Sequence, residues 1–202
     1  MRTLIGGLVL ALLGLGLPQQ AKAEPHWYAG AGIGLNKLTS LEEKNVNLAG
    51  FPGAPPFGDV EIKFDFGFNF HVRGGAYVLP RLRVEGELNY IDSDVKEVNV
   101  AGTTYKADSD LWLGVGTINV LYDILDSSSS VIPFVGAGFG MAYTDIEDIT
   151  DEGIAATGIV GLSFTLRDKM RFEPSYKLLW LNGQGDDFYI HMVRIGLIIG
   201  IN

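Results

Sequence analysis

The chain has 202 residues, enough for one domain with a sizeable core, and it contains no cysteine, which excludes disulfides and thiolate metal sites. Glycine supplies 27 residues, about twice its usual share of roughly 7%. The 24 acidic residues outnumber the 15 basic ones and give a formal net charge of −9. A surface of this charge repels nucleic acid, so we expect no nucleic-acid partner.

The first 23 residues have the features of a cleavable secretory signal peptide. Arg2 supplies the positive start, residues 4–17 form an apolar core too short to span a bilayer, and Ala21 and Ala23 frame an A-x-A cleavage site. A buried helix or a membrane anchor is the alternative interpretation. We expect residues 1–23 to be the signal peptide and residues 24–202 to form one domain. Removal of the signal peptide takes away two basic residues and leaves a formal charge of −11.

Residues 61–91 contain two long runs in which apolar and polar side chains alternate. In the first run every second residue from Ile62 to Val78 is apolar or small, and the residues between them are mostly polar or glycine. Successive side chains of a strand point to opposite faces, so each run predicts a β-strand with one apolar and one charged face. Both strands exceed the usual length of about five or six residues.

Eight alternating or glycine-rich runs predict eight strands. They cover residues 26–36, 61–78, 82–92, 111–124, 131–144, 154–166, 170–182 and 188–201. The links at 79–81, 125–130 and 167–169 are short, whereas those at 37–60, 93–110 and 145–153 are longer, and residues 51–58 are too rich in proline and glycine to be strand. Outer-membrane barrels combine short periplasmic turns with longer outer loops and an even strand number. The sequence therefore predicts an all-β fold, an eight-stranded antiparallel up-and-down transmembrane β-barrel.

Aromatic residues near the predicted strand ends indicate two girdles at the membrane boundaries. They are Trp27, Tyr90, Trp112, Tyr122, Phe134, Tyr143, Phe172, Trp180 and Tyr189. Ten residues separate Trp112 from Tyr122 on one face, which spans roughly 25 Å at about 3.3 Å per residue and a tilt of about 40°. The alternative is a soluble, lipocalin-like barrel with the polarity inverted. Long strands, alternating links and the lack of a flanking helix favour the membrane barrel.

Two glycine-rich stretches and the closing strand carry a family resemblance. They are residues 27–34 (WYAGAGIG), 132–140 (IPFVGAGFG) and 193–201 (VRIGLIIGI). In them the chain resembles the small outer-membrane barrels of the Opacity, OmpA-barrel and OmpX type, which include porin-like surface antigens. The resemblance implies the outer membrane of a Gram-negative bacterium. Its implied partners are outer-membrane lipid, lipopolysaccharide, the barrel assembly machinery, and extracellular ligands that bind through the loops.

Charged residues occupy the face opposite the apolar one and should point into the barrel. They are Lys63, Asp65, His71, Arg73, Arg83, Glu85, Glu87, Arg171, Glu173, Lys177 and Arg194. The lumen of an eight-stranded barrel is only wide enough for side chains to fill, and unpaired buried charges are costly, so we expect an ion-pair network. A three-residue loop at 79–81 places Arg73 opposite Glu87. The network is either structural or a gate for ions or protons that involves His71.

Signals for an enzyme, a metal or a cofactor are weak. No serine lies two residues from His26, His71 or His191, and parity turns His191 toward lipid. The acidic segment 145–152 lacks the ligand spacing of a calcium loop. We expect no catalytic residue, no metal and no cofactor, and a non-enzymatic barrel that serves envelope structure or surface interaction through acidic loops. The alternative is a narrow, OmpW-like channel or carrier for ions or small hydrophobic molecules.

Overall fold

The computed structural model describes residues 26–48, 55–126, 129–146, 149–167, 169–182 and 187–201. The expected signal peptide lies outside these ranges, so the division of the chain at residue 23 stays a prediction. Among the residues described, no helix is long and apolar enough to cross a membrane.

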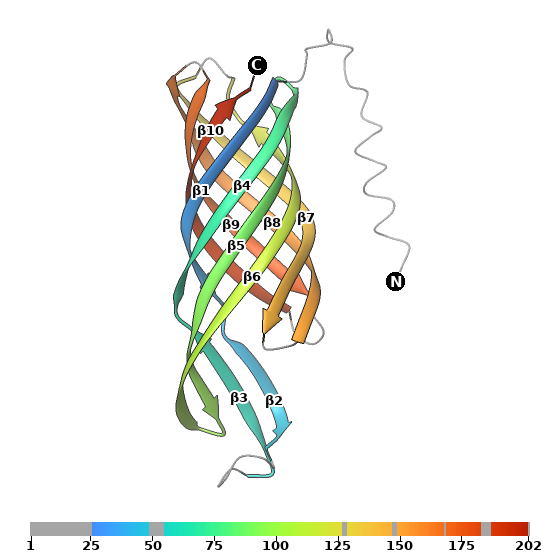
Figure 1. Cartoon of the computed structure of the whole chain (residues 1–202), viewed down its shortest axis with the longest axis vertical. Coiled ribbons are helices and arrows are strands. Elements are labelled where there is room, and N and C mark those ends of the chain that lie inside the picture. The colour runs from blue at the N-terminus through green and yellow to red at the C-terminus, as the bar shows by residue number, and fades with distance from the viewer. Residues whose placement is uncertain are drawn as a thin grey trace, which may run out of the picture.

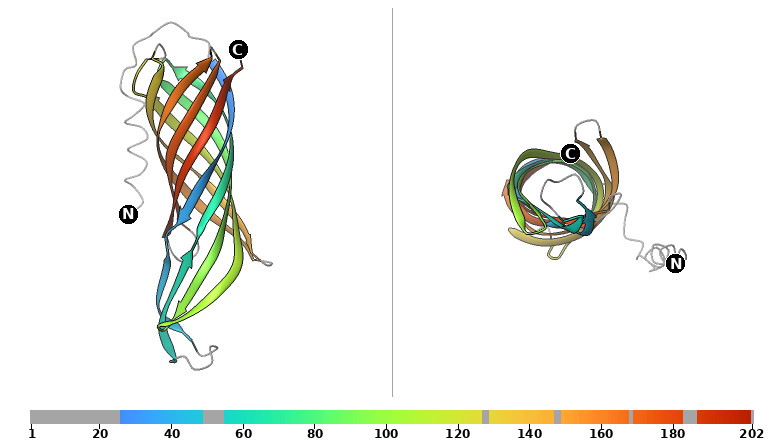
Figure 2. Two further views of the ribbon diagram at one scale, coloured as in Figure 1. Left: turned by 90° about the vertical axis from the view of Figure 1, so that its left-hand side faces the viewer. Right: turned by 90° about the horizontal axis from the view of Figure 1, so that it is seen from below.

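Eight long strands close into an antiparallel barrel (Figure 1). They are β1 (His26–Leu38), β4 (Phe66–Leu79), β5 (Leu82–Val100), β6 (Thr103–Asp123), β7 (Val131–Ile146), β8 (Ile149–Arg167), β9 (Met170–Asn182) and β10 (Asp187–Gly200). From β4 to β10 each strand pairs with the next along the chain, and β1 pairs with both β4 and β10, which completes the ring seen end-on in Figure 2. The predicted fold class is confirmed.

Two further strands lie outside the ring. Strand β2 (Leu41–Asn47) pairs with β3 (Phe57–Phe64), and β3 pairs with the far end of β5, from Val95 to Val100. Together with the β5–β6 hairpin they form a sheet that projects beyond the barrel (Figures 1 and 2), and we call β2, β3, residues 95–100 of β5 and residues 103–110 of β6 the blade.

The blade corrects the prediction of long loops at 37–60 and 93–110. Most of both segments is strand, and β5 turns into β6 through Ala101 and Gly102 alone, whose φ angles are 49° and 85°. Phe57 and Gly58, expected to be irregular, begin β3, whereas residues 51–54 lie outside the described ranges. The signal was weak because residues 41–47 do not alternate and because a register shift between Val95 and Glu97 changes the parity of β5.

The two ends of the barrel differ in their connections. The turn end holds the start of β1, the end of β10 and short links such as Pro80–Arg81; the loop end carries the blade (Figure 1). At the turn end Arg81 Nε donates a 2.7 Å hydrogen bond to Asp126 Oδ1, which ties two links together and raises the pKa of Arg81. The register of β4 against β5 places Arg73 opposite Glu87, as the sequence predicted.

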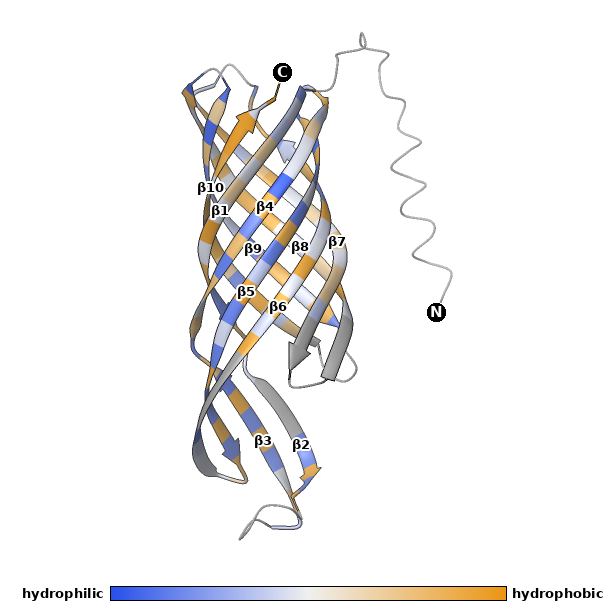
Figure 3. Cartoon of the chain, in the orientation of Figure 1, coloured by the Kyte–Doolittle hydropathy of each residue, from blue (hydrophilic) through white to orange (hydrophobic). Residues whose placement is uncertain are grey.

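The apolar face of the barrel points outward. Phe66, Phe68 and Leu88 are each about two-thirds exposed, whereas Arg83, Glu85 and Glu87 are at most 2% exposed. Figure 3 shows the same alternation of hydrophilic and hydrophobic residues along β4 and β5. This polarity is that of a membrane barrel and the reverse of a soluble one, so the lipocalin-like alternative is excluded.

Candidate functional site

The lumen encloses a charge-balanced set of buried side chains. Among the residues described, four buried cations (Arg73, Arg83, Lys177, Arg194) face four buried anions (Glu85, Glu87, Asp123, Glu173). They come from strands β4, β5, β6, β9 and β10, so the set connects most of the barrel wall. Because taking a lone charge out of water is very costly, equal numbers of the two signs are what such an interior requires.

Glu87 is the hub of the group nearest the middle of the barrel. Its Oε1 atom lies 2.5 Å from Lys177 Nζ and 2.9 Å from Arg194 Nη1. Asn89 Nδ2 donates a further bond to the same oxygen at 2.8 Å, and Lys177 also reaches Thr117 Oγ1 at 3.4 Å. One carboxylate thus neutralises cations from two other strands and bridges the lumen from β5 to β9 and β10.

Arg83 is the hub of the group nearer the turn end. Its guanidinium contacts Glu173 Oε1 and Asp123 Oδ1, each at 3.1 Å. The same guanidinium lies 4.8 Å from the centre of the Phe134 ring, and the Tyr28 and Tyr77 rings also face it, at 5.9 and 5.7 Å. Two carboxylates and three aromatic faces therefore hold this fully buried cation.

Tyrosine hydroxyls and two further arginines complete the turn-end group. Tyr28 Oη donates to Glu85 Oε2 at 2.9 Å, and Arg73 spans Glu85 and Glu173 at 4.0 and 3.1 Å. Arg171 lies at the mouth of the lumen, with its side chain 22% exposed, and donates to Tyr77 Oη at 2.6 Å. It is the most exposed cation of the network and lies closest to solvent at this end.

His71 lies against the wall of the lumen beside β1. A Cβ atom at Gly32 would come within 2.5 Å of the His71 ring. The glycine therefore leaves the room that the ring occupies, which gives one of the period-two glycines of β1 a packing role. His71 forms no ion pair with the other described residues, so the ion pairs of the network form without it.

The buried side chains in the loop-end half of the lumen are mostly apolar, although Asn36, Asn69 and Ser93 are buried there too. The buried apolar cluster consists of Leu38, Phe64, Ile91, Leu113, Val115, Ala142, Ala155, Leu179, Leu181, Ile190 and Met192. Ile62, Val95, Leu111 and Phe188 pack against this cluster from the direction of the blade and the loops. Along the lumen, charged side chains thus fill the part near the turn end, and mainly apolar side chains fill the part near the loop end.

Two residues expected in the network lie elsewhere. Lys63 belongs to β3 in the blade, where its side chain is 44% exposed and pairs with Glu61 at 3.4 Å. Asp65 occupies the break between β3 and β4, and its Oδ1 accepts the backbone N–H of Phe66. Both predictions are wrong because the inward face ends where β3 leaves the ring. The other nine predicted residues all line the lumen or its mouth.

Of the aromatic residues expected in the two girdles, one points into the lumen. Tyr90, Trp112 and Tyr143 form a row across β5, β6 and β7 on the outer face, with ring centres 6.3 Å apart in each pair. Trp27, Tyr122 and Tyr189 are 43–57% exposed, and Phe172 contacts Phe164 at 6.3 Å. Phe134 is 1% exposed and points inward onto Arg83, so its place in the girdle is corrected. Its position near a strand end suggested the girdle, although the parity of β7 turns it inward.

Sequence reasoning missed Asp123, Tyr28 and the role of Tyr77. Asp123 follows Thr117 and Asn119 at even spacing in β6, and all three are buried in the lumen. This even spacing was the signal in the sequence that could have identified Asp123 as a lumen residue. For Tyr28, no sequence pattern separates an inward tyrosine at the start of a strand from a girdle residue.

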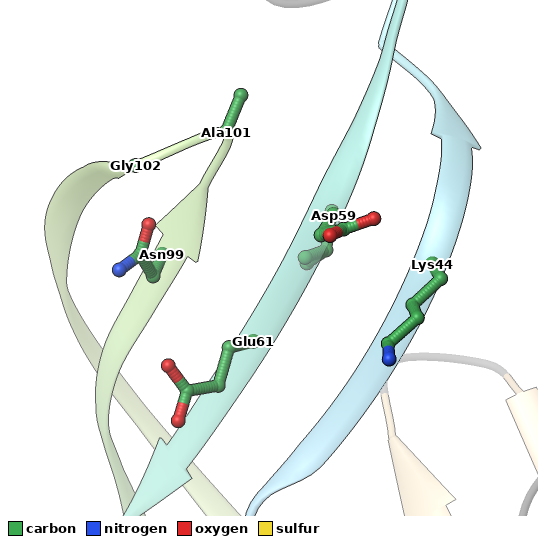
Figure 4. A pocket seen from close by; sticks show the side chains of 7 residues that line it. Lys44, Asp59, Glu61, Asn99, Ala101 and Gly102 are labelled. Atoms are coloured by element: carbon green, nitrogen blue, oxygen red, sulfur yellow. The ribbon is translucent and has the colours of Figure 1, made fainter.

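A hollow with a volume of about 340 Å³ lies on the blade (Figure 4). Lys44, Asp59, Glu61 and Asn99 line it from β2, β3 and β5. It is open and carries both charge signs, and Glu61 is already paired with Lys63. Among the residues described, no group of three histidine, aspartate or glutamate side chains could hold a metal ion.

Residues 7–198 match the family model described as the outer membrane protein beta-barrel domain, so the chain belongs to that family. Membership supports an outer-membrane location. In such barrels the short turns face the periplasm, which makes the turn end periplasmic and the loop end extracellular.

Solved structures share the fold at low sequence identity. Neisserial surface protein A has a TM-score of 0.60 and 18% identity, over 87% of this chain and 97% of that chain. The outer membrane protein OprG from Pseudomonas aeruginosa has a TM-score of 0.58 and 14% identity, over 87% and 93%. No curated protein matches the sequence. At these identities the likeness concerns the fold alone.

Proposed function

We propose that this outer-membrane barrel is a non-enzymatic protein whose lumen is a closed plug and whose activity lies on its outer surface. The carrying observation is the filled lumen: eight buried charges of balanced sign, followed by eleven buried apolar residues. An ion that entered would have to displace paired charges and then cross a segment whose buried side chains are mostly apolar and solvate it poorly. The network is therefore structural in this proposal rather than a gate.

Export and partners belong to the same proposal. Residues 1–23 direct export to the periplasm, and the assembly machinery inserts the remainder. The blade then stands outside the membrane, where its exposed strands meet lipopolysaccharide and extracellular ligands. The length of β5 and β6 supports this position of the blade, because both strands run well past the aromatic row at Tyr90 and Trp112.

A liposome-swelling assay tests the closed lumen. Liposomes that contain the folded wild-type protein should swell in small sugars and amino acids no faster than protein-free liposomes. A known porin in parallel liposomes reports that the assay detects a pore. Solute-dependent swelling by the wild type would overturn the proposal.

A carrier for small hydrophobic molecules is the second candidate, and the apolar loop-end half of the lumen favours it. Such a molecule would enter between Phe64, Leu113 and Leu179, which are buried together. A fluorescent apolar probe should then bind the detergent-solubilised barrel, and a Leu179→Asp substitution should abolish binding. Probe fluorescence that does not change on addition of wild-type protein would rule the carrier out.

A further inference from the structure

Three polar side chains interrupt the lipid-facing surface close to the loop end. Lys37 is the penultimate residue of β1, His191 is the fifth residue of β10, and Tyr176 lies beside it on β9. Lys37 and His191 are register partners on adjacent strands, and the Tyr176 hydroxyl lies 2.5 Å from His191 Nδ1. A lysine on the lipid face costs about 0–1 kcal/mol near the interface and about 2–4 kcal/mol at the midplane. Their position near the loop end therefore places these groups at headgroup depth.

The register of β4, β1 and β10 arranges their outward side chains in rows that cross the three strands. We call three of these rows the grid. Phe66, Lys37 and His191 form the row nearest the loop end. The next row holds Phe68, Leu35 and Val193, and the third holds Phe70, Ile33 and Ile195. The grid thus has one cation, Lys37, in the row nearest the loop end, and apolar side chains in the two rows beneath it.

The two apolar rows line a groove of about 560 Å³ on the outer wall. Its lining side chains are strongly exposed, with Phe68 at 69% and Val193 at 65%. The groove runs along the strands away from Lys37 and His191. Its size and largely apolar lining suit a hydrocarbon chain, and Lys37 lies one row nearer the loop end.

Contacts within the protein hold the Lys37 side chain in place. Lys37 Nζ donates to the Phe64 carbonyl at 2.5 Å and lies 4.9 Å from the centre of the Phe66 ring. Among the side chains that the structure describes, no carboxylate pairs with it. Asp65 turns its Oδ1 to the Phe66 backbone, and Asp92 lines the far wall of the groove on β5, with β4 between it and β1.

We propose that this face binds one phosphorylated lipid of the outer leaflet. The phosphate binds Lys37, whose ammonium group lies on the β4 side of β1, and an acyl chain fills the groove over Leu35 and Val193. The charge of Lys37 selects the anion, and the apolar groove one row beneath Lys37 selects a lipid over a free ion. Tyr189, on the same face of β10 two residues nearer the loop end, marks the boundary at which such a headgroup lies. The inference requires the membrane orientation given by the family and is independent of whether the lumen conducts.

Native mass spectrometry of the purified full-length protein in detergent tests the site with diphosphoryl lipid A as the probe. Lys37→Gln should weaken binding about tenfold, as loss of a charge-assisted bond predicts. Lys169→Gln, which removes an exposed lysine at the turn end, is the matched control and should leave affinity unchanged. Equal weakening by both substitutions would reduce the effect to general charge and overturn the proposal.

Two further arms separate the headgroup from the chain. Fully dephosphorylated lipid A should bind the wild type as weakly as diphosphoryl lipid A binds Lys37→Gln, and Lys37→Gln should not weaken it further. Val193→Trp should obstruct the groove and reduce binding, whereas Val160→Trp on the lipid face of β8 should not. Binding of inorganic phosphate as tight as that of the lipid and unaffected by Val193→Trp would assign the site to a free ion and contradict a lipid site. Each variant must keep the gel shift between unboiled and boiled samples, which reports a folded barrel.

Discussion

Both halves of the lumen are densely filled, but different interactions hold their side chains together. In the periplasmic half, Glu87 and Arg83 each join partners from other strands at 2.5–3.1 Å, so direction and charge determine the fit. In the extracellular half, residues such as Leu179 and Ile190 are fully buried and contribute by volume alone. The charged half is sensitive to the loss of a single partner, because the partner left behind stays buried. The apolar half is sensitive to the volume removed.

The largest expected effect is that of Glu87→Ala. This change leaves Lys177 and Arg194 without their shared carboxylate and should lower the free energy of unfolding by about 3–5 kcal/mol. Denaturant titration in lipid vesicles, followed by tryptophan fluorescence, measures it. Glu61→Ala removes one partner of the exposed pair with Lys63 and should cost less than about 1 kcal/mol.

A double substitution sharpens the same comparison. Glu87→Gln with Lys177→Met removes one charge of each sign and restores a neutral interior. It should be more stable than Glu87→Gln alone, because one fewer cation is left unpaired. A double variant that loses the sum of the two single effects would show that the charges act independently.

In the apolar half, Leu179→Ala should cost up to about 5 kcal/mol, because it removes transfer free energy and leaves a cavity. Leu162→Ala, on the lipid-facing side of β8, should cost only the transfer component of about 2 kcal/mol. The same titration compares the two. Equal losses would contradict a densely packed interior at the loop end.

Tyr28→Phe should have a smaller effect, about 1.5–3 kcal/mol, because it removes one hydrogen bond to the buried Glu85 carboxylate. Tyr90→Phe, on the outer face, is the control and should stay within about 0.5 kcal/mol. If both substitutions are neutral, Glu85 must have another donor in place of the hydroxyl.

The smallest effect is expected in the blade. Ala101 has a φ of 49°, a conformation that glycine adopts without penalty. Ala101→Gly should therefore slow hydrogen exchange of the β5–β6 hairpin about two- to fivefold, which corresponds to about 0.4–1 kcal/mol. Exchange in the barrel strands should not change, and faster exchange in the hairpin would show that the turn is not strained.

The sequence predicted the barrel because period-two alternation survives wherever one face meets lipid and the other the lumen. The same parity indicated that Arg73, Glu87 and Lys177 share a face. It could not predict that Glu87 pairs with Lys177, 90 residues away, because that contact depends on how the closed ring brings β5 opposite β9. The blade was missed because residues 41–47 do not alternate and because the parity of β5 shifts between Val95 and Glu97. Phe134 was misplaced because its position near a strand end outweighed its parity.

Planar-bilayer recording tests the central claim, the closed lumen, most directly. Folded wild-type protein, with insertion verified by the gel shift of the unboiled form, should give no current steps above the bare bilayer at moderate voltage. Glu87→Ala should raise the frequency of brief openings if the Glu87 group contributes to closure. Stable conductance steps from the wild type would contradict the account.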